Sequence, residues 1–444
     1  MAGSPTRERL VLVGNGMAGM ACLEHVLAYQ PDLDITVFGD ETHVNYNRVL
    51  LSSVLAGEKS ADDIVLNSLD WYRSRGIHLR LGTRVTDVDA DAKTITAADG
   101  TTTPYDTLLI ATGSSAWMPP IAGLDKDGVF VFRTLDDTRA LVDRAGPSTR
   151  AVVIGGGLLG LEAARGLQVH GSDVTVVHLV DTLMERQLDA TGGGYLVRKM
   201  EALGIKVLLG RKTTAIVGGD VVEGVELAGG ERLDATLVVV AAGIRPNVDL
   251  GRRAGLTVNR GIVVNDYMET SRPDVFAVGE CVEHNGICYG IVAPLFEQAK
   301  VLAATMTGHK GPTYTGTVPA ATLKIMGVDV FSAGTWSEGD DVEPVRYEDP
   351  TLGVYKKIVV RDNKLAGLIL VGDTSDSHRY VDWLRRGADV APMRKHLLFP
   401  APAADRGLEA AEMADSTVVC GCLGVTKGAI IQAVHERGVC TLSQ

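Results

Sequence analysis

Cysteine and aromatic residues are scarce in this sequence, and both shortages narrow the classes of protein to which it can belong. Its 444 residues include six cysteines, and aromatic residues make up 5% of the chain. Six cysteines in a chain of this length do not form the dense disulfide framework of a small secreted domain. Hydrophobic residues nevertheless make up 45%, so the chain can bury a large core and is not expected to be disordered.

Long apolar segments are also missing. The longest apolar run, near residues 235–244, has the length of a strand and falls short of the roughly 18 residues that span a membrane. The N-terminal residues carry Arg7 and Arg9 and run from a short apolar stretch directly into a glycine turn, which is unlike a signal peptide. We therefore expect a cytoplasmic protein with no membrane partner.

An excess of positive charge is absent as well. The 43 Lys and Arg residues are outnumbered by 55 Asp and Glu residues, so the formal net charge is −12 at pH 7. This balance argues against nucleic acid as a partner, because proteins that bind a phosphate backbone usually carry basic patches. It does not exclude cofactors that contain phosphate, because backbone N–H groups can hold a phosphate.

Glycine is abundant, and two glycine-rich turns stand in the same local context. Each turn follows an apolar strand and opens a helix, and a second strand comes after the helix. Strands that alternate with helices indicate parallel sheets and an α/β fold. We expect these strand–helix–strand units at residues 9–13, 17–29 and 35–38 and again at residues 151–154, 158–169 and 174–177.

The first turn carries a dinucleotide-binding fingerprint. Gly14 permits the tight turn, Gly16 lets a pyrophosphate approach the backbone, and Gly19 allows the helix to pack closely on the strand. The N-terminus of the helix supplies N–H groups and partial positive charge for the pyrophosphate. Asp40 follows the second strand, where a carboxylate can accept hydrogen bonds from ribose hydroxyls. The competing interpretation is a tight turn that holds no ligand.

The second turn has the same pattern but a different residue after its second strand. Its glycines are Gly155, Gly157 and Gly160. His178 stands where the first unit has its carboxylate, and it can donate to a ribose hydroxyl or, when protonated, to a 2′-phosphate. Asp181 and Glu185 nearby would repel an additional phosphate, which favours NADH over NADPH. The competing interpretation of His178 is an exposed strand end.

Two dinucleotide-binding turns in one chain predict two dinucleotides that exchange electrons, one a bound flavin and the other a diffusing nicotinamide. A third motif indicates their order, because Thr270 is followed by Ala277, Gly279 and Glu280. It is similar to the second flavin motif of two-dinucleotide flavoproteins, in which an acidic residue, usually Asp, holds the ribityl chain. On these three motifs the chain resembles the pyridine nucleotide–disulfide oxidoreductase superfamily over about residues 8–375.

The segment after the first unit distinguishes two branches of that superfamily. Disulfide reductases carry a pair of cysteines on the helix after the flavin fingerprint, whereas residues 46–53 read YNRVLLSS and contain no cysteine. This segment is similar to the ferredoxin, rubredoxin and nitrite reductase branch, whose members pass electrons outward. The resemblance implies two Rossmann-like FAD- and NAD(P)-binding domains of the three-layer ββα type, followed by an α+β C-terminal domain.

Two cysteines near the end of the sequence are candidate metal ligands. Cys420 and Cys422 are separated by one glycine, a spacing that lets two thiolates bind one side of a metal cluster. The segment VVCGCLGVTKGAI is similar to the opening half of the bacterioferritin-associated-ferredoxin-like (BFD-like) [2Fe–2S] module, which adds a second cysteine pair. That pair is not in the sequence, and Cys440 stands at a different position. A [2Fe–2S] cluster and two reduced thiols in a truncated module are therefore both open.

The order of the segments is similar to the front half of the large subunit of assimilatory NAD(P)H-dependent nitrite reductases. Matching phrases include VGNGMAG, HLVDTLMERQLD, FAVGECVEHNG and YGIVAPLFEQAK. The sirohaem and [4Fe–4S] domain of that family is not in the sequence, so we expect the electron acceptor in another domain or subunit. The implied domains are an FAD-binding domain at residues 7–117 and 246–312, an NAD(P)H-binding domain at 118–245, the α+β domain at 313–399, a linker at 400–416 and a partial BFD-like module at 417–444.

The resemblance also implies which residues hold the two nucleotides. Arg48 is expected along the FAD phosphates or near the isoalloxazine, and Glu162 is expected to point toward the nicotinamide, with surface roles as the alternatives. The expected FAD contacts are Gly14, Gly16, Ala18, Gly19, Asp40, Arg48, Thr112, Gly113, Arg133, Gly279, Glu280, Pro294 and Glu297. The expected NAD(P)H contacts are Gly155, Gly157, Gly160, Glu162, His178 and Gly243.

Three functions remain open from the sequence. The leading one is an FAD-dependent NAD(P)H oxidoreductase that passes electrons to an Fe–S or sirohaem nitrite reductase centre in nitrate and nitrite assimilation. A second is an NADH:ferredoxin or NADH:rubredoxin type of reductase that uses a separate carrier protein. A third, from a different class, is a non-catalytic flavin-binding redox sensor. The sequence leaves a homodimer open for each of them.

Overall fold

The described part of the chain forms two compact units. The first combines residues 1–179 with 204–317, and the second combines residues 180–203 with 318–444. The structure, a computed structural model, describes residues 7–309, 311, 313–325, 327–399, 414, 415, 418–420 and 425–437.

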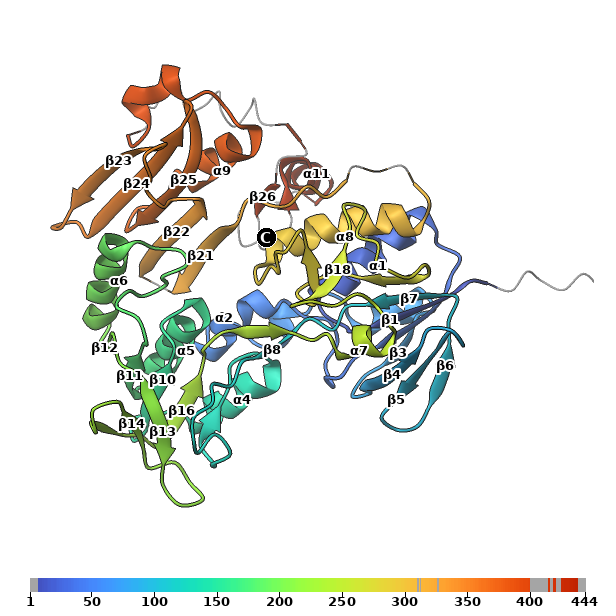
Figure 1. The fold of residues 1–444 in the computed structure, drawn as a ribbon, viewed down its shortest axis with the longest axis horizontal. Helices are drawn as coiled ribbons and strands as arrows, with labels where there is room; N and C mark the ends of the chain where they lie inside the picture. Colours follow the sequence, from blue (N-terminus) through green and yellow to red (C-terminus); the bar gives the residue numbers. More distant parts are fainter. Residues whose placement is uncertain are drawn as a thin grey trace, which may run out of the picture. The chain divides into compact units, whose positions relative to one another are not determined.

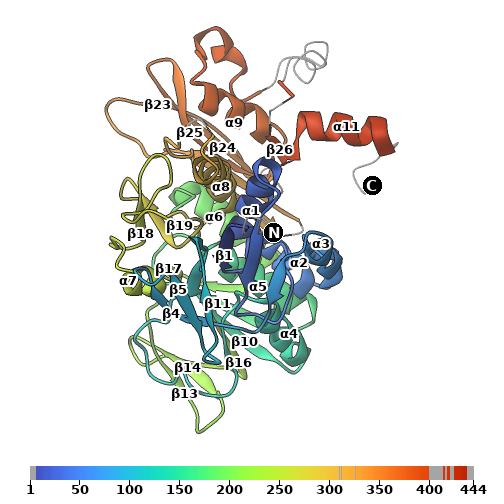
Figure 2. The same ribbon diagram turned by 90° about the vertical axis from the view of Figure 1, so that its right-hand side faces the viewer.

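The first glycine turn belongs to a parallel five-stranded sheet of the first unit. The strands run in the order β19 (Val275–Ala277), β7 (Thr107–Ile110), β1 (Arg9–Val13), β2 (Asp34–Phe38) and β3 (His78–Arg80). Helices α1 (Met17–Tyr29) and α8 (Val292–Met306) lie side by side in both ribbon views (Figure 1, Figure 2). A small antiparallel sheet of β4 (Val85–Asp89), β5 (Thr94–Ala97) and β6 (Thr102–Pro104) shares the same hydrophobic core. Helices, parallel sheet and antiparallel sheet are the three layers that the sequence predicted.

The second glycine turn belongs to another parallel sheet of the same kind. Its order is β12 (Lys206–Leu208), β11 (Asp173–Val177), β10 (Arg150–Ile154), β16 (Leu237–Val240) and β9 (Val129–Phe130). Helix α5 (Leu158–Val169) follows β10, and the antiparallel strands β13 (Thr213–Val217), β14 (Gly224–Leu227) and β15 (Arg232–Asp234) complete the layers. The prediction of two Rossmann-like units is therefore confirmed. The central strands are apolar on both faces, as parallel strands covered on both sides must be.

Shorter elements link the two sheets. The first group is η1 (Arg48–Leu50), α2 (Leu51–Leu55), η2 (Asp62–Ile64), α3 (Leu69–Ser74) and α4 (Leu135–Arg144). The second group is α7 (Asp249–Arg253), β18 (Ile262–Val264) and β20 (Val282–His284). Strands β8 (Ser114–Ala116) and β17 (Ile244–Pro246) pair as an antiparallel ribbon where the chain passes between the two sheets.

The second unit is built on an antiparallel sheet. Its order is β21 (Ala320–Ile325), β22 (Val328–Gly334), β25 (Lys364–Val371), β24 (Val354–Arg361) and β23 (Glu343–Asp349). The turn predicted between two of these strands is present, and Asp362 and Asn363 adopt positive φ angles of 49° and 57° in it. Helix α9 (Ser377–Arg386) packs on β22 and β25, and η3 (Ala391–His396) follows it.

Helix α6 (Ala190–Ala202) also packs on this antiparallel sheet (Figure 1), although the sequence assigned its residues to the NAD(P)H domain. Asp189 caps the helix, since its Oδ1 accepts from the Gly192 N–H at 2.9 Å. Its Oδ2 accepts from the Tyr355 hydroxyl at 2.7 Å and from Lys357 Nζ at 2.9 Å. The same carboxylate thus starts α6 and binds it to β24, which explains why residues 180–203 belong to the second unit.

The last described elements are β26 (Val418–Cys420), β27 (Val425–Thr426) and α11 (Lys427–Arg437). The side chain of Cys420, the whole of Cys422 and most of the predicted linker lie outside the described residues. Among the residues that are described, no group of three or more His, Cys, Asp or Glu side chains could hold a metal ion. The [2Fe–2S] module therefore stays a prediction.

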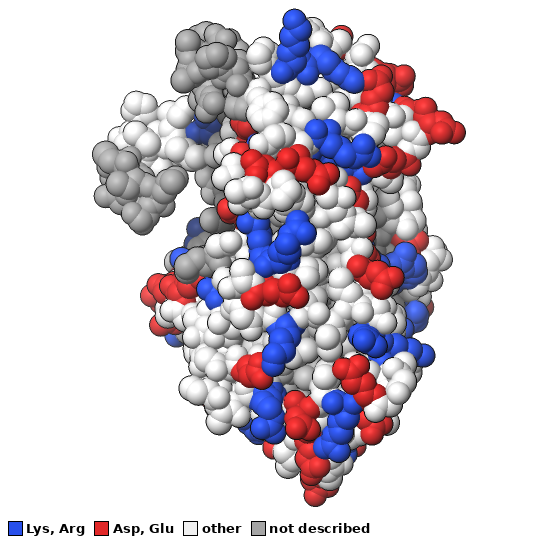
Figure 3. All heavy atoms as spheres, turned by 90° about the vertical axis from the view of Figure 1, so that its left-hand side faces the viewer, with Lys and Arg blue, Asp and Glu red and all other residues white. Residues whose placement is uncertain are grey.

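Two surface properties bear on partners. Within the described residues, every helix is too short or too polar to cross a membrane. On the face drawn in Figure 3, Lys and Arg side chains are interspersed with Asp and Glu side chains.

Two adjacent lysines of β24 are buried on opposite faces of the antiparallel sheet, because successive side chains of a strand alternate. Lys357 lies on the α6 side, and Lys356 contacts Asp373 with Nζ and Oδ2 2.5 Å apart. The Lys356 side chain is 5% exposed, and that of Asp373 is 41% exposed. Burial alone would raise the pKa of Asp373, but hydrogen bonds from Lys356 and Ser375 lower it to about 2.

Replacing Asp373 by Ala should destabilise the second unit by about 1–3 kcal/mol at pH 7, because a buried ammonium group loses its partner. The folded-state pKa of Asp373 lies below its unfolded value, so the stabilisation is complete at neutral pH and is lost as the pH falls through about 2. Denaturant titrations of both proteins from pH 7 to pH 2 would measure this difference. The control D70A removes an exposed partner of Arg73 and should leave the free energy of unfolding within about 0.5 kcal/mol of the wild type. Equal stability of D373A and the wild type at pH 7 would contradict the assignment.

Candidate functional site

The first glycine loop is shaped by contact with the neighbouring strand β7. Gly14 has φ +113°, and a Cβ at this position would stand 2.1 Å from the Ala111 carbonyl oxygen. A Cβ at Gly19 would stand 2.7 Å from the Ala111 side chain, so both glycines are required for packing. Gly16 has nothing within 4 Å of its Cβ position, so this part of the loop faces open space. Ala18 is buried and lies against Gly279.

The second glycine loop repeats this geometry. Gly155 has φ +123°, and its Cβ would stand 2.3 Å from the Ala241 carbonyl oxygen. A Cβ at Gly160 would stand 2.0 Å from the Gly155 carbonyl oxygen, while Gly157 faces open space. Helices α1 and α5 both begin at a glycine and have no side-chain cap, so their first N–H groups are available to an anion.

His178 touches the second loop directly. The Gly156 N–H donates to His178 Nδ1 at 3.0 Å, and the side chain is 8% exposed. Because Nδ1 accepts this hydrogen bond, a neutral ring carries its hydrogen on Nε2. His178 thus supports the glycine loop, a contact that the sequence could not reveal.

Asp40 and its neighbour Glu41 have different surroundings. Asp40 is exposed at the end of β2, where Arg84 Nε donates to its carboxylate at 3.1 Å. Glu41, which the sequence analysis did not select, accepts from the Tyr46 hydroxyl at 2.6 Å and also from Arg48. Burial raises the pKa of the Tyr46 phenol, which keeps that hydroxyl a donor.

Three predicted residues that are far apart in the sequence meet in one polar cluster. Arg48 Nη1 donates to the Arg133 carbonyl oxygen at 2.9 Å, and Arg133 Nη2 donates to the Glu280 carboxylate. Ser114 joins them, because its hydroxyl accepts from Arg133 at 2.8 Å and donates to Glu280 at 2.7 Å. The Glu280 side chain is 13% exposed, and its carboxylate forms an ion pair with the Arg133 guanidinium. Ser114 was missed, although it directly follows the predicted Thr112 and Gly113.

The turn after β7 is held by a residue that directly follows β17, the strand paired with β8. Thr112 Oγ1 donates to the Asn247 carbonyl oxygen at 2.8 Å, and Asn247 Nδ2 donates to the Thr112 carbonyl oxygen at 2.8 Å. Gly113, with φ +64°, and Gly243, with φ +118°, both face open space. Asn247 was also missed, although it closes the segment AAGIRPN that contains Gly243.

The start of α8 brings two further predicted residues to the first unit. Pro294 is buried in the first turn of the helix, which has no side-chain cap. The Glu297 carboxylate accepts from the Thr317 hydroxyl, which in turn is 2.9 Å from the Tyr314 hydroxyl. On α5, Glu162 is 8% exposed, so it is not a glutamate of the helix surface.

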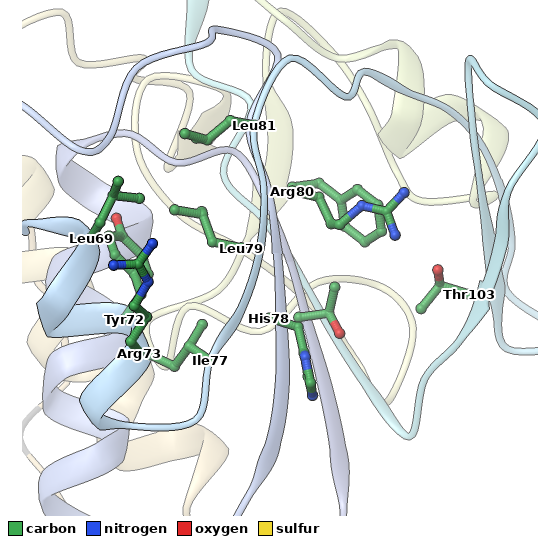
Figure 4. Close-up of a pocket in the computed structure, with 11 residues that line it drawn as sticks. Leu69, Tyr72, Arg73, Ile77, His78, Leu79, Arg80, Leu81 and Thr103 are labelled. Carbon is green, nitrogen blue, oxygen red and sulfur yellow. The ribbon is translucent and has the colours of Figure 1, made fainter.

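A hollow of about 600 Å³ lies beside the edge strand β3 (Figure 4), and its lining residues include none of the predicted nucleotide contacts. Leu79 and Tyr72 line one side of it, and Arg80 and Thr103 line the other. The Tyr72 hydroxyl donates to Asn15 Oδ1 at 2.7 Å, so the wall of the hollow touches the first glycine loop. The hollow is not part of the predicted nucleotide sites.

The site residues fit FAD and NAD(P)H. Backbone at Gly16, Gly113, Gly157 and Gly243 borders open space, as a cradle for a dinucleotide requires. The buried Asn47 Nδ2, beside Arg48, has no hydrogen-bond partner within the described residues. A buried donor without a partner is costly, and a bound nucleotide would supply the acceptor. The role of each residue stays a prediction.

Comparison with known proteins gives a family for most of the chain. The pyridine nucleotide-disulphide oxidoreductase model matches residues 8–305, and the rubredoxin NAD+ reductase C-terminal domain model matches residues 319–388. The chain is 48% identical to a nitrite reductase [NAD(P)H] of Bacillus subtilis, covering 97% of this chain and 54% of that protein. It is 46% identical to the assimilatory nitrate reductase electron transfer subunit of the same organism, covering 99% of this chain and 56% of that protein.

A solved structure supports the same family. The putidaredoxin reductase in its covalent complex with putidaredoxin superposes with a TM-score of 0.80 at 25% identity, covering 87% of this chain and 95% of that chain. The chain spans about half the length of the curated relatives described above. It belongs to the pyridine nucleotide-disulphide oxidoreductase family, and it is an oxidoreductase that uses FAD and NAD(P)H as cofactors.

Proposed function

We propose that this chain takes electrons from NAD(P)H onto bound FAD and passes them to an Fe–S or sirohaem centre that reduces nitrite. The observation that carries the proposal is the pair of glycine loops in one compact unit, each at an uncapped helix N-terminus. The cluster of Arg48, Arg133 and Glu280 lies in the same unit. A hydrogen bond from Arg48 to Arg133 and an ion pair between Arg133 and Glu280 connect the segment after β2, through the segment after β9, to the segment after β19.

The residues of the chain would bind and orient the two nucleotides. When bound, FAD would supply a hydride acceptor for the nicotinamide and a group able to release electrons one at a time. The α1 N-terminus and Gly16 would hold the FAD pyrophosphate, and Glu280, with its charge balanced by Arg133, would accept from ribityl hydroxyls. Gly157 and the α5 N-terminus would hold the pyrophosphate of NAD(P)H. Hydride transfer needs no acid or base from the protein, so orientation and exclusion of water are its main contributions.

The acceptor is proposed from the relatives. Of the two Bacillus subtilis proteins, one is named a nitrite reductase and the other an electron transfer subunit of nitrate reductase. We propose that this chain delivers electrons to a corresponding domain or subunit in the cytoplasm. Cys420 and Cys422 would then be two ligands of an intermediate [2Fe–2S] cluster, completed by cysteines elsewhere. A homodimer stays an open proposal.

A second candidate function is an NADH-dependent reductase of a separate ferredoxin or rubredoxin. The match of residues 319–388 to the rubredoxin NAD+ reductase C-terminal domain favours it. The two candidates share the same chemistry at the nucleotides and differ only in the acceptor. Reduction of purified rubredoxin or ferredoxin at a rate comparable to that of nitrite reductase would favour the second candidate.

An anaerobic titration tests the proposal and the choice of coenzyme. We expect NADH to bleach the absorbance of the bound flavin, and NADPH to bind about tenfold more weakly, a difference of about 1.4 kcal/mol. The reason is that His178 Nδ1 already accepts from the Gly156 N–H and so is not a donor to a 2′-phosphate, while Asp181 and Glu185, which follow it in the sequence, would repel an additional phosphate. A protein that binds FAD but is not bleached by either coenzyme would support the redox sensor instead. A protein that binds no FAD after reconstitution would defeat both.

Two glycine variants distinguish an effect on folding stability from an effect on FAD affinity. G16A places a methyl group in open space on a backbone with φ −94°, so the FAD-free protein should keep its stability within about 0.5 kcal/mol. Its affinity for FAD should fall by at least about tenfold, because the pyrophosphate needs that space. G14A should instead cost about 1–3 kcal/mol in stability, since its Cβ meets Ala111. Flavin absorbance per protein and thermal unfolding measure both effects, and normal FAD binding by G16A would refute the assignment.

Alkylation of thiols tests the absence of a dithiol relay. Cys22 and Cys281 are buried, and burial raises the pKa of both thiols as well as that of Cys288. Treatment with iodoacetamide should therefore leave the bleaching of the flavin by NADH unchanged, as followed by stopped-flow absorbance. If alkylation abolished bleaching, a thiol would take part in the first electron transfer.

A further inference from the structure

Two helices of the first unit meet at a contact that the proposed function does not use. Leu55, the last residue of α2, is 0% exposed. Gly166 of α5 leaves the space that Leu55 fills, because a Cβ at Gly166 would stand 2.5 Å from Leu55 Cγ and 2.7 Å from Cδ2. His170 Nε2 lies 2.7 Å from the Leu55 carbonyl oxygen. We call these three residues the α2–α5 contact.

The hydrogen bond in this contact has a defined direction. A backbone carbonyl can only accept, so His170 Nε2 carries the hydrogen and donates it. Carbonyl groups in the last turn of a helix have no partner within that helix. His170, which is also the C-cap of α5, therefore completes the end of α2 while it ends its own helix. The packing of Leu55 against Gly166 and the hydrogen bond from His170 thus hold the C-terminal ends of the two helices together.

The opposite ends of these segments lead to the two predicted nucleotide sites. Helix α5 begins at Gly157 in the second glycine loop and carries Glu162 one turn before Gly166. Helix α2 continues directly from η1, whose first residue, Arg48, donates to Arg133. From Gly157 to Gly166 an α-helix extends about 13 Å at 1.5 Å per residue. A displacement at the contact would therefore be carried by two short, packed segments to both sites.

We infer that the α2–α5 contact sets the spacing between the FAD site and the NAD(P)H site, with Leu55, Gly166 and His170 as positioning residues. The inference rests on the proposed function. Hydride transfer requires the reacting atoms to lie about 3–3.5 Å apart, and a misplacement of about 1 Å can cost roughly 100-fold in rate. A methyl group at Gly166 must displace Leu55 by about 1 Å, because carbon atoms pack at about 3.5–4.0 Å.

The first test is the rate at which NADH bleaches the flavin of the holoprotein. G166A should lower this rate by about 10–100-fold and keep the primary isotope effect of C4-deuterated NADH. The FAD content and the Kd for NADH should stay unchanged, because neither nucleotide loop is altered. The matched control is G194A, which adds the same methyl group to α6 where nothing lies within 4 Å. An unchanged bleaching rate in G166A would overturn the inference.

The second test is rescue. The L55A substitution removes the Cγ and Cδ2 atoms that the added methyl group would meet. The double variant G166A/L55A should therefore recover most of the rate that G166A loses. A double variant as slow as G166A would overturn the inference, because the loss would then not arise from this pair.

The third test needs no electron transfer. In the FAD-free protein, the amides of residues 51–57 should exchange their hydrogens faster in G166A than in the wild type and return toward wild-type exchange in the double variant. H170A removes the hydrogen-bond donor without adding atoms. Like G166A, it should speed the amide exchange and slow the flavin bleaching, so it replaces G166A as the test variant if G166A does not fold. Unchanged exchange and bleaching in H170A would overturn the inference. Failure of NADH to bleach the wild type would instead overturn the proposed function, since the exchange data would still report on the contact.

Discussion

Helices α1 and α5 begin at glycines that offer no side-chain oxygen to the first N–H groups of the helix. In the same unit, α4 has these groups satisfied by a capping box of Thr134 and Asp137. Helix N-termini without a cap, at the carboxyl ends of parallel strands, leave donors that an anion can satisfy. The glycine loops cannot relax to satisfy these donors themselves, because Gly14 is held against Ala111 and Gly155 against Ala241. Both predicted nucleotide sites depend on this constraint.

The charged residues around the first loop are arranged in pairs rather than singly. Arg133 and Glu280 are joined directly, and Arg48 lies between the Glu41 carboxylate and the Arg133 carbonyl oxygen. Partly buried charges are costly when one partner is missing, so these segments support one another. The cluster connects the segments that follow β2, β9 and β19. It therefore links the shape of the predicted flavin site to the position of the segments that cross between domains.

In the second unit, one carboxylate holds a helix against a sheet other than the parallel sheet that precedes it in the chain. Helix α6 follows β11 in the chain, where an α/β unit would normally place it on its own parallel sheet. Asp189 instead shares its two oxygens between the start of α6 and the side chains of Tyr355 and Lys357. A Cβ at Gly192 would come within 3.4 Å of the Tyr355 ring, so the small residue permits the close approach. The helix thereby joins the C-terminal sheet.

The sequence by itself determined the features that are local. Both glycine fingerprints, the strands and helices around them, and the turn at Asp362 and Asn363 were predictable, because a few consecutive residues set the backbone of each. Only the tertiary structure decided which side chains meet. Glu41, Ser114 and Asn247 escaped prediction, since their partners lie in other segments and hydrogen bonds form between whatever the fold brings together. The same reason applies to α6, whose sequence carries no sign of the sheet on which it packs.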